Sequence, residues 1–233
     1  MLLAYSTTSD YEVMVSELAK CSLEDVIKTN QMNNKQLSKR TQVVYVQQLA
    51  QGMNYLHTCK PPIIHRDLKP ANLLIDYSGV LQITDFGLAK LRPKPSQKGS
   101  DTYRLTGETG SYRYMAPEVY RYEDYDETVD VYSYAMIFYY IIAGHQPWPT
   151  LPGVKAAHAA AIEGLRPNIP RDWDQTLAAM LKRCWDENPT LRPRFSNILQ
   201  ELSNYSHVVF KTEEDEELHE LDLHGSKCGC IVS

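Results

Sequence analysis

The chain has 233 residues, of which 43% are hydrophobic and 23% charged, a balance that allows one sizeable core and excludes a disordered or fibrous protein. No apolar run approaches the roughly 20 residues that span a bilayer, and the cysteines follow no signal peptide, so we expect reduced thiols in the cytoplasm. The net charge of -5 comes from the segment after Phe210, because acidic and basic residues balance before it. Charge therefore gives no reason to expect nucleic acid as a partner.

The first half of the chain alternates short strands with helices. A helix is expected over residues 22–28, and apolar side chains with a 3.6-residue period predict an amphipathic helix over residues 39–57. β-Branched and apolar runs predict four strands, over residues 1–5, 11–15, 73–75 and 81–83.

The second half is expected to be helical. Residues 91–110 are polar and rich in Pro, Gly and Thr, which is typical of a long functional loop. Residues 129–143 are almost all apolar or aromatic, which predicts a helix buried on all sides. Further helices are expected over residues 155–162, 173–185 and 195–205.

Three motifs follow one another in order. They are Ile64-His65-Arg66-Asp67-Leu68-Lys69-Pro70-Ala71-Asn72, then Asp85-Phe86-Gly87 thirteen residues after Asn72, then Ala116-Pro117-Glu118. They resemble the catalytic loop, the metal-binding turn and the end of the activation segment of eukaryotic protein kinases. The resemblance runs from residue 1, at the fourth strand of the small lobe, to about residue 205.

The resemblance implies an α+β fold, mostly α, built as a protein-kinase large lobe with only a remnant of the small β lobe. Residues 1–19 would be that remnant, two strands and the hinge, and residues 20–207 the large lobe. Residues 208–233 form an acidic tail with too little apolar content to join the core.

The residues of these motifs suit phosphoryl transfer, which needs metal ions on the phosphates, a carboxylate near the attacking hydroxyl and positive charge against the migrating group. Asp67 would orient the hydroxyl, Lys69 would face the phosphate, and Asn72 and Asp85 would hold Mg²⁺. The cofactors implied are ATP and Mg²⁺. An isolated Asp is more often a cap of a loop turn, but the joint pattern argues against that interpretation.

Other positions match the kinase pattern in structural or regulatory roles. Glu118 and Arg192 resemble a buried ion pair, and Asp130 the acid that caps the catalytic-loop backbone. Tyr132 stands where the family usually has Trp. Glu17, Ala19 and Leu74 would bind adenine, although Leu74 is as readily plain core. The remaining matches are His65 and Phe86, which stack in the kinase core, with Gly87 of the metal-binding turn and Arg66, a clamp for a loop phosphate.

Lys69 and Ser111 resemble the residues that serine/threonine kinases carry at these positions. The resemblance implies phosphorylation of protein substrates on serine or threonine. The final helices look closest to the tyrosine-kinase-like group, with its Raf-like and plant integrin-linked-kinase-like members. Candidate phosphosites in the polar loop are Thr102, Thr106 and Thr109.

The glycine-rich loop and strand lysine that hold ATP phosphates in kinases are missing from this sequence. Two interpretations therefore compete. The chain is part of an active Ser/Thr kinase whose start is omitted, or it is a catalytically impaired module that binds protein partners. Asp67, Asn72 and Asp85 favour the first interpretation.

The last four residues, Cys230-Ile231-Val232-Ser233, match a prenylation box, and Cys228 could carry a second lipid. The protein would then associate with the cytoplasmic face of a membrane, although the acidic upstream segment disfavours this. A zinc site made of His219, His224, Cys228 and Cys230 is a weaker alternative.

Overall fold

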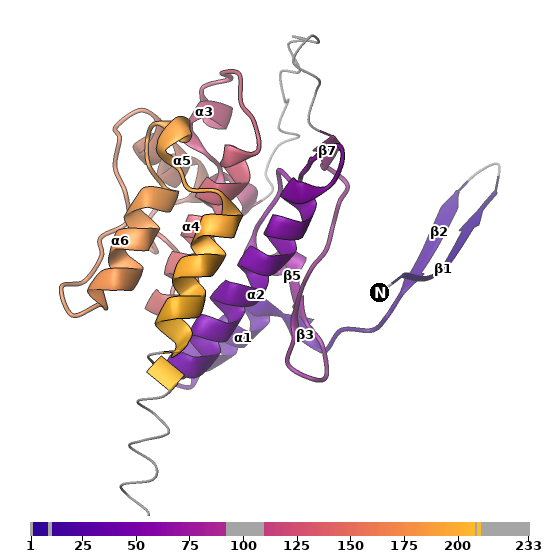
Figure 1. Ribbon diagram of the computed structural model, residues 1–233, viewed down its shortest axis with the longest axis horizontal. Helices are drawn as coiled ribbons and strands as arrows, with labels where there is room; N and C mark the ends of the chain where they lie inside the picture. Colours follow the sequence, from indigo (N-terminus) through magenta and orange to yellow (C-terminus); the bar gives the residue numbers. More distant parts are fainter. Residues whose placement is uncertain (1, 9–10, 92–109, 208, 211–233) are drawn as a thin grey trace, which may run out of the picture.

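A computed structural model describes residues 2–8, 11–91, 110–207 and 209–210. Most of the described residues outside loops are helical, which confirms the mostly α fold (Figure 1). The α-helices are α1 (Leu23–Met32), α2 (Lys39–Thr58), α3 (Pro117–Tyr120), α4 (Thr128–Ala143), α5 (Gly153–Ala161) and α6 (Gln175–Cys184), followed by a helix over residues 195–207. Three short 3₁₀ helices are η1 (Pro70–Asn72), η2 (Gly110–Tyr114) and η3 (Pro189–Leu191).

The strands form three small antiparallel sheets. They are β1 (Leu2–Thr7), β2 (Glu12–Ser16), β3 (Cys21–Ser22), β4 (Ile63–Ile64), β5 (Leu73–Ile75), β6 (Leu81–Ile83) and β7 (Lys90–Leu91). Strand β1 pairs with β2, β5 lies between β3 and β6, and β4 pairs with β7. The β5–β6 hairpin thus follows the catalytic motif directly and leads into the metal-binding turn.

Helix α4 is the axis of the core. Every residue from Val129 to Ile141 is buried, as the continuous apolar run predicts. The helix ends at Gly144, whose φ of +70° gives the left-handed cap that glycine adopts at low cost. Helices α2 and α6 pack against α4. Within the described residues, none of the helices combines the length and the apolar character needed to cross a membrane.

Helix α2 lies close against the β5–β6 hairpin. A Cβ on Gly52 would come within 2.6 Å of the side chain of Ile83, so the glycine in the middle of this helix permits the contact. Helix α2 and the β5–β6 hairpin together support the loops that carry the first two motifs.

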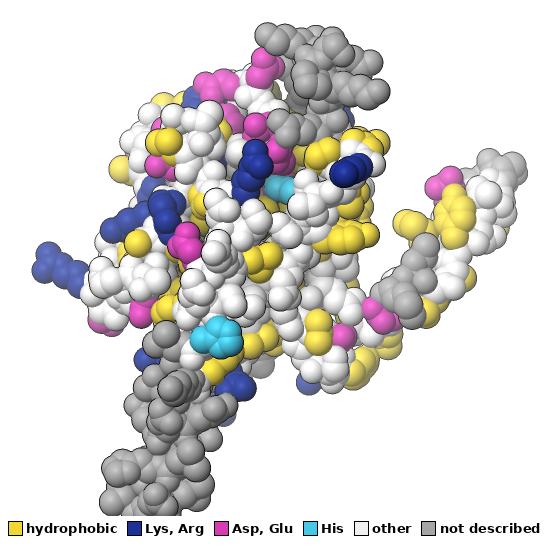
Figure 2. Space-filling model, in the orientation of Figure 1, with side chains coloured by type: hydrophobic (Ala, Val, Ile, Leu, Met, Phe, Trp, Pro, Cys, Tyr) yellow, Lys and Arg dark blue, Asp and Glu magenta, His cyan; other side chains and the backbone are white. Residues whose placement is uncertain are grey.

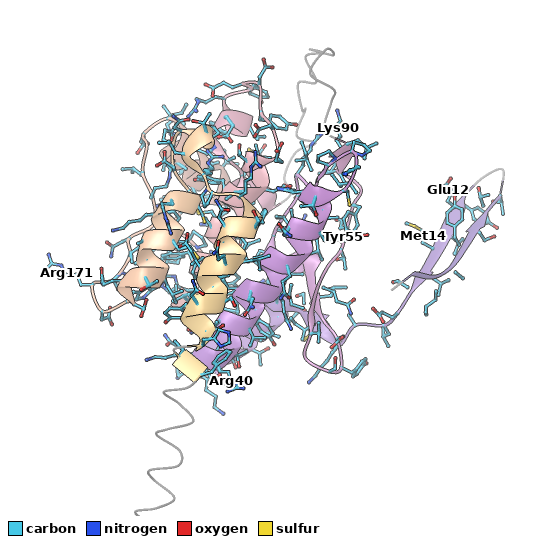
Figure 3. The ribbon with its side chains drawn as sticks, in the orientation of Figure 1. Glu12, Met14, Arg40, Tyr55, Lys90 and Arg171 are labelled. Carbon is cyan, nitrogen blue, oxygen red and sulfur yellow. The ribbon has the colours of Figure 1, made fainter. Side chains whose placement is uncertain are left out.

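The β1–β2 hairpin stands apart from the helical body (Figure 1). Apolar side chains remain uncovered on it: Leu3, Val13 and Val15 are exposed, and Met14 is 73% exposed. Figure 2 shows this hydrophobic surface away from the body, and Figure 3 shows Glu12 and Met14 on β2. A two-stranded hairpin alone buries too little surface to be stable in water.

Several boundaries differ from the sequence-based expectation, and capping fixes two of the starts. Helix α1 begins at Leu23, after a capping box made by Ser22 and Asp25, and it ends at Met32, four residues further than expected. Helix α6 begins at Gln175 and not at Trp173, because the Asp174 side chain accepts hydrogen bonds from the backbone of Thr176 and Leu177. Strands of two residues are too short to leave a sequence pattern, so β3, β4 and β7 were not predicted.

Candidate active site

The catalytic loop is fastened to the buried helix α4 through Asp130. The carboxylate of Asp130 is fully buried and accepts hydrogen bonds from the backbone N–H of His65 at 2.9 Å and of Arg66 at 2.8 Å. His57 Nε2, at the end of α2, lies 2.9 Å from the same carboxylate. Arg66 has a φ of +71°, which is uncommon for a residue with a side chain. Asp130 therefore stabilises a turn that would otherwise be strained.

Two side chains of the loop, those of Lys69 and Asn72, converge on one oxygen of the Asp67 carboxylate. Lys69 Nζ lies 2.7 Å from Asp67 Oδ2, and Asn72 Nδ2 donates to the same oxygen at 3.1 Å and to the Asp67 carbonyl at 2.9 Å. Asp67 and Asn72 are buried, and Lys69 is half-buried. The short helix η1 brings Asn72 back over Asp67, because Pro70 fixes its first turn.

The metal-binding turn lies next to this cluster because Thr84 bonds to Asn72. The backbone N–H and the hydroxyl of Thr84 donate to the carbonyl of Asn72 at 2.9 and 3.0 Å. Asp85 follows at once, exposed and with a φ of +63°. The N–H of Gly87 donates to Asp85 Oδ1 at 3.3 Å.

Asn72 and Asp85 suit a magnesium ion. The Nδ2 of Asn72 is engaged by Asp67, so Oδ1 is the atom of that amide that could ligate a cation. The Asp85 carboxylate is accessible from solvent. Both groups offer the hard oxygen ligands that Mg²⁺ prefers.

Phe86 departs from the expected core position. Its ring packs against His65 with centroids 5.1 Å apart, but Phe86 is 48% exposed whereas His65 is fully buried. His65 Nε2 donates to the carbonyl of Thr84 at 3.0 Å and so fixes the imidazole under the turn.

The residues expected at the adenine ring lie in the segment after β2 and on the β5–β6 hairpin. Glu17 and Ala19 are half-buried in the segment that joins β2 to β3. Leu74 is half-buried in the centre of β5, paired with Ser22 and Gln82. The N–H of Lys20 donates to the carbonyl of Ile75 at 2.8 Å, which anchors this segment to the hairpin.

Arg192 and Glu118 form a bidentate ion pair. The two guanidinium nitrogens lie 2.6 and 2.9 Å from the two carboxylate oxygens, with side-chain exposures of 0% and 3%. Arg192 also donates to the carbonyls of Thr128 and Asp186. The pair ties α3 to the segment before the last helix, in the geometry that arginine, and not lysine, provides.

A protein kinase domain model matches residues 1–202 of the chain. The chain belongs to the protein kinase family. Among its relatives, the serine/threonine-protein kinase STY17 of Arabidopsis thaliana is 39% identical over 177 residues, which are 76% of this chain and 29% of the relative. The serine/threonine-protein kinase VIK of the same plant is 42% identical over 176 residues, 74% of this chain and 40% of the relative.

The plant serine/threonine-protein kinase CTR1 is 37% identical over 164 residues, 70% of this chain and 19% of CTR1. This kinase chain therefore spans less than half the length of these relatives. The resemblance to serine/threonine kinases of the Raf-like kind, first seen in the motifs, is confirmed by these matches.

Tyr132, at the position of the family's usual Trp, lies fully buried in this chain. Its ring packs under two guanidiniums, those of Arg192 and Arg166, at 5.2 and 5.3 Å from the ring centroid. Among the described residues its hydroxyl has no hydrogen-bond partner. Burial raises the pKa of Tyr132 far above its ordinary value, so the hydroxyl stays protonated.

Several predicted positions lie outside the described residues. They are the candidate phosphosites Thr102, Thr106 and Thr109, the candidate lipidation sites Cys228 and Cys230, and the alternative zinc ligands His219 and His224. The backbone of Ser111 lies in η2, but its side chain is not described. These assignments stay predictions.

Sequence reasoning missed three residues that organise the candidate site. They are His57, which contacts Asp130, Thr84, which joins the two loops, and Arg113, whose guanidinium donates to three backbone carbonyls. Thr84 lies beside a motif, so a closer look at motif neighbours could have found it. Nothing in the spacing marks His57 or Arg113, because their partners are distant in the sequence.

Proposed function

We propose that this protein transfers the γ-phosphoryl group of ATP to serine or threonine hydroxyls of protein substrates in signalling. The observation that carries the proposal is the convergence of Lys69 and Asn72 on one oxygen of Asp67, at 2.7 and 3.1 Å. A carboxylate, an amine and an amide held this closely form a site for positioning a hydroxyl next to a phosphate.

Each residue of the cluster has a distinct part in the proposed reaction. Asp67 accepts a hydrogen bond from the substrate hydroxyl and takes its proton as the hydroxyl oxygen bonds to the γ-phosphorus, the bond from that phosphorus to the bridging oxygen breaks, and ADP leaves. Lys69 holds Asp67 in place and adds positive charge where negative charge accumulates on the phosphoryl oxygens. The Asn72 amide fixes the Asp67 carboxylate from the other side.

Asn72 Oδ1 and the Asp85 carboxylate are the atoms that would hold Mg²⁺. Bound Mg²⁺-ATP supplies the phosphoryl group and the neutralisation of its charge. Glu17, Ala19 and Leu74 are proposed to face the adenine. Thr84 keeps the metal-binding side chains close to Asp67, because it joins the turn to Asn72.

The choice of serine and threonine rests on Lys69, on Ser111 and on the serine/threonine kinases among the relatives. Phosphoamino-acid analysis of a protein mixture treated with the full chain and labelled ATP tests this choice. Label on serine and threonine supports the proposal, and label confined to tyrosine contradicts it.

The competing interpretation, an impaired binding module, makes a different prediction for nucleotide. Titration of the full chain with ATP in the presence and absence of Mg²⁺ distinguishes the two. Metal-dependent binding that is weakened in Asp85→Asn is expected for the kinase. If ATP gave the same heat or fluorescence change with the wild-type chain and with Asp85→Asn, the result would favour the binding module.

Cytoplasmic localisation with lipid attachment is also part of the proposal. It is supported by the Cys230-Ile231-Val232-Ser233 segment, if the protein ends at Ser233, and by the second cysteine at Cys228. Intact-mass measurement of protein from cells should show an added isoprenoid and loss of the last three residues. An unmodified mass would contradict lipidation and leave the proposed kinase activity unaffected.

A further inference from the structure

Arg113 gathers three backbone carbonyls on one guanidinium. Nη1 donates to the carbonyls of Pro147 and Trp148 at 2.5 and 2.7 Å, and Nη2 donates to the carbonyl of Leu151 at 2.6 Å. Arg113 is 8% exposed and lies in η2, more than thirty residues from its partners along the chain. Hydrogen bonds from a charged donor are stronger than neutral ones, so this contact holds the two segments firmly.

The Pro147–Leu151 segment, which Arg113 contacts, has an unusual backbone conformation. Trp148 has a φ of +46°, a conformation that residues with a side chain rarely adopt. Its carbonyl also accepts the N–H of Leu151 at 3.0 Å, which closes the turn. Such a strained residue persists only where its surroundings hold it, and here the guanidinium of Arg113 does so. The turn brings all three carbonyls to the same side.

The Pro147–Leu151 turn leads directly into α5, and α5 packs against η2. The alanines of α5 are buried. At Gly153 a Cβ would lie 3.7 Å from the Cβ of Tyr112, so helix and η2 are in close contact. Arg113 therefore crosses an interface that is already tightly packed, and it sets the position of both sides.

Tyr114, at the end of η2, lines the same hollow as Asp67, the proposed catalytic residue. The hydroxyl of Ser133 in α4 donates to the carbonyl of Tyr114 at 2.8 Å. A hollow opens beside Asp67, with walls formed by Arg66, Leu68, Tyr114, Met115, Val119 and Tyr125. A polypeptide that presents a hydroxyl to Asp67 would pass over this hollow and over the edge of η2.

We propose that Arg113 is a positioning residue for the protein substrate. It locks η2 and the Pro147–Leu151 turn into one platform that receives the polypeptide beside Asp67. Both terminal nitrogens are engaged by main-chain carbonyls, so Arg113 acts through the platform and not by pairing with an acidic substrate. This inference rests on the proposed phosphoryl transfer.

The full chain is compared with Arg113→Met, which keeps the apolar stem but removes the donors, and with Arg113→Lys. Arg166→Met is the matched control. Arg166, beyond the end of α5, also donates to three carbonyls, those of Trp185, Ala160 and Leu165, and in addition to the carboxylate of Glu187. Hydrogen exchange and steady-state kinetics with dephosphorylated casein are measured on all four proteins.

In Arg113→Met we expect amide exchange to rise together in residues 110–116 and 147–151. We also expect KM for casein to rise by roughly tenfold or more while KM for ATP changes less than about twofold. Arg113→Lys should recover part of the casein KM. Arg166→Met should leave the ratio of the two KM values unchanged.

Equal changes in both KM values, an unchanged casein KM, or faster exchange in only one of the two segments would overturn the proposal. If the wild-type chain transfers no phosphate, the proposed function fails by itself. Hydrogen exchange then decides alone whether Arg113 couples the two segments: a joint rise supports the coupling, and any other pattern overturns it.

Discussion

The backbone N–H of Arg66 donates a hydrogen bond of 2.8 Å to the carboxylate of Asp130, which lies 64 residues further along the chain. The same helix, α4, carries Ser133, whose hydroxyl bonds to Tyr114 at the end of η2. One buried helix thus fixes both the loop that carries Asp67 and the segment that borders it. The site is built around α4 because α4 is the most deeply buried element among the described residues.

Replacing the central acid tests this arrangement. In Asp130→Asn one carboxylate oxygen becomes an NH₂ group that cannot accept the loop N–H groups or His57 in the same way. We expect the free energy of unfolding to fall by about 1–3 kcal/mol and amide exchange at His65 and Arg66 to accelerate. Asp124→Asn, at an exposed acid, is the control. Unchanged exchange at both amides would show that the loop is held by other contacts.

The ion pair of Glu118 and Arg192 should be costly to break. Glu118→Gln leaves the buried guanidinium uncompensated, so we expect a loss of about 3–5 kcal/mol in denaturant unfolding. Glu123→Gln is the matched control, since Glu123 pairs with Arg121 at the surface. In Glu123→Gln the loss of unfolding free energy should stay below about 1 kcal/mol. Similar losses in the two variants would contradict the assignment of Glu118 as a buried structural charge.

Tyr132 should tolerate, and even benefit from, the removal of its hydroxyl. Tyr132→Phe keeps the ring between two guanidiniums and deletes a buried donor that lacks a partner among the described residues. We expect a gain of about 1 kcal/mol in stability. Tyr139→Phe provides the opposite case, because its hydroxyl donates to the carbonyl of Asn168 at 3.2 Å. There we expect a loss of about 0.5–1.5 kcal/mol, and equal signs for the two variants would refute the explanation.

The capping box of α1 predicts a pH dependence. The hydroxyl and then the backbone N–H of Ser22 hydrogen-bond to Asp25 and lower its pKa in the folded state. A lowered pKa means that the stabilisation is present above the carboxyl's unfolded pKa and is lost as pH falls through the folded value. Asp25 is exposed, so its interaction is screened by solvent, and Asp25→Asn should cost about 0.5 kcal/mol at pH 7. Thermal melts from pH 7 down to the acid limit of folding should show the two proteins converging, and a constant difference would contradict this.

Sequence reasoning succeeded where local pattern and fold coincide. The apolar run of α4 admits only a buried helix, and the amphipathic period of α2 gives its extent almost to the residue. The ion pair of Glu118 with Arg192 and the contact of Asp130 with the loop were expected from the kinase motifs, and both contacts are present.

Other features depend on contacts that no local pattern encodes. Arg113 binds carbonyls, which every residue possesses, so its partners leave no mark in the sequence. The contact of His57 with Asp130 joins residues 73 positions apart. Phe86 is 48% exposed, and the burial of its ring depends on residues that are distant from it in the sequence.

Asp67 carries the central claim, and the rate of phosphate transfer measures it most directly. The full chain is incubated with Mg²⁺ and γ-labelled ATP, with dephosphorylated casein as acceptor, beside Asp67→Asn and the surface control Asp124→Asn. We predict label on casein serine and threonine, a fall of about 10²-fold or more in Asp67→Asn, and no change in Asp124→Asn. Metal-dependent binding of ATP should persist in all three proteins. Transfer by Asp67→Asn at the wild-type rate, or no transfer by the wild-type chain, would contradict the account.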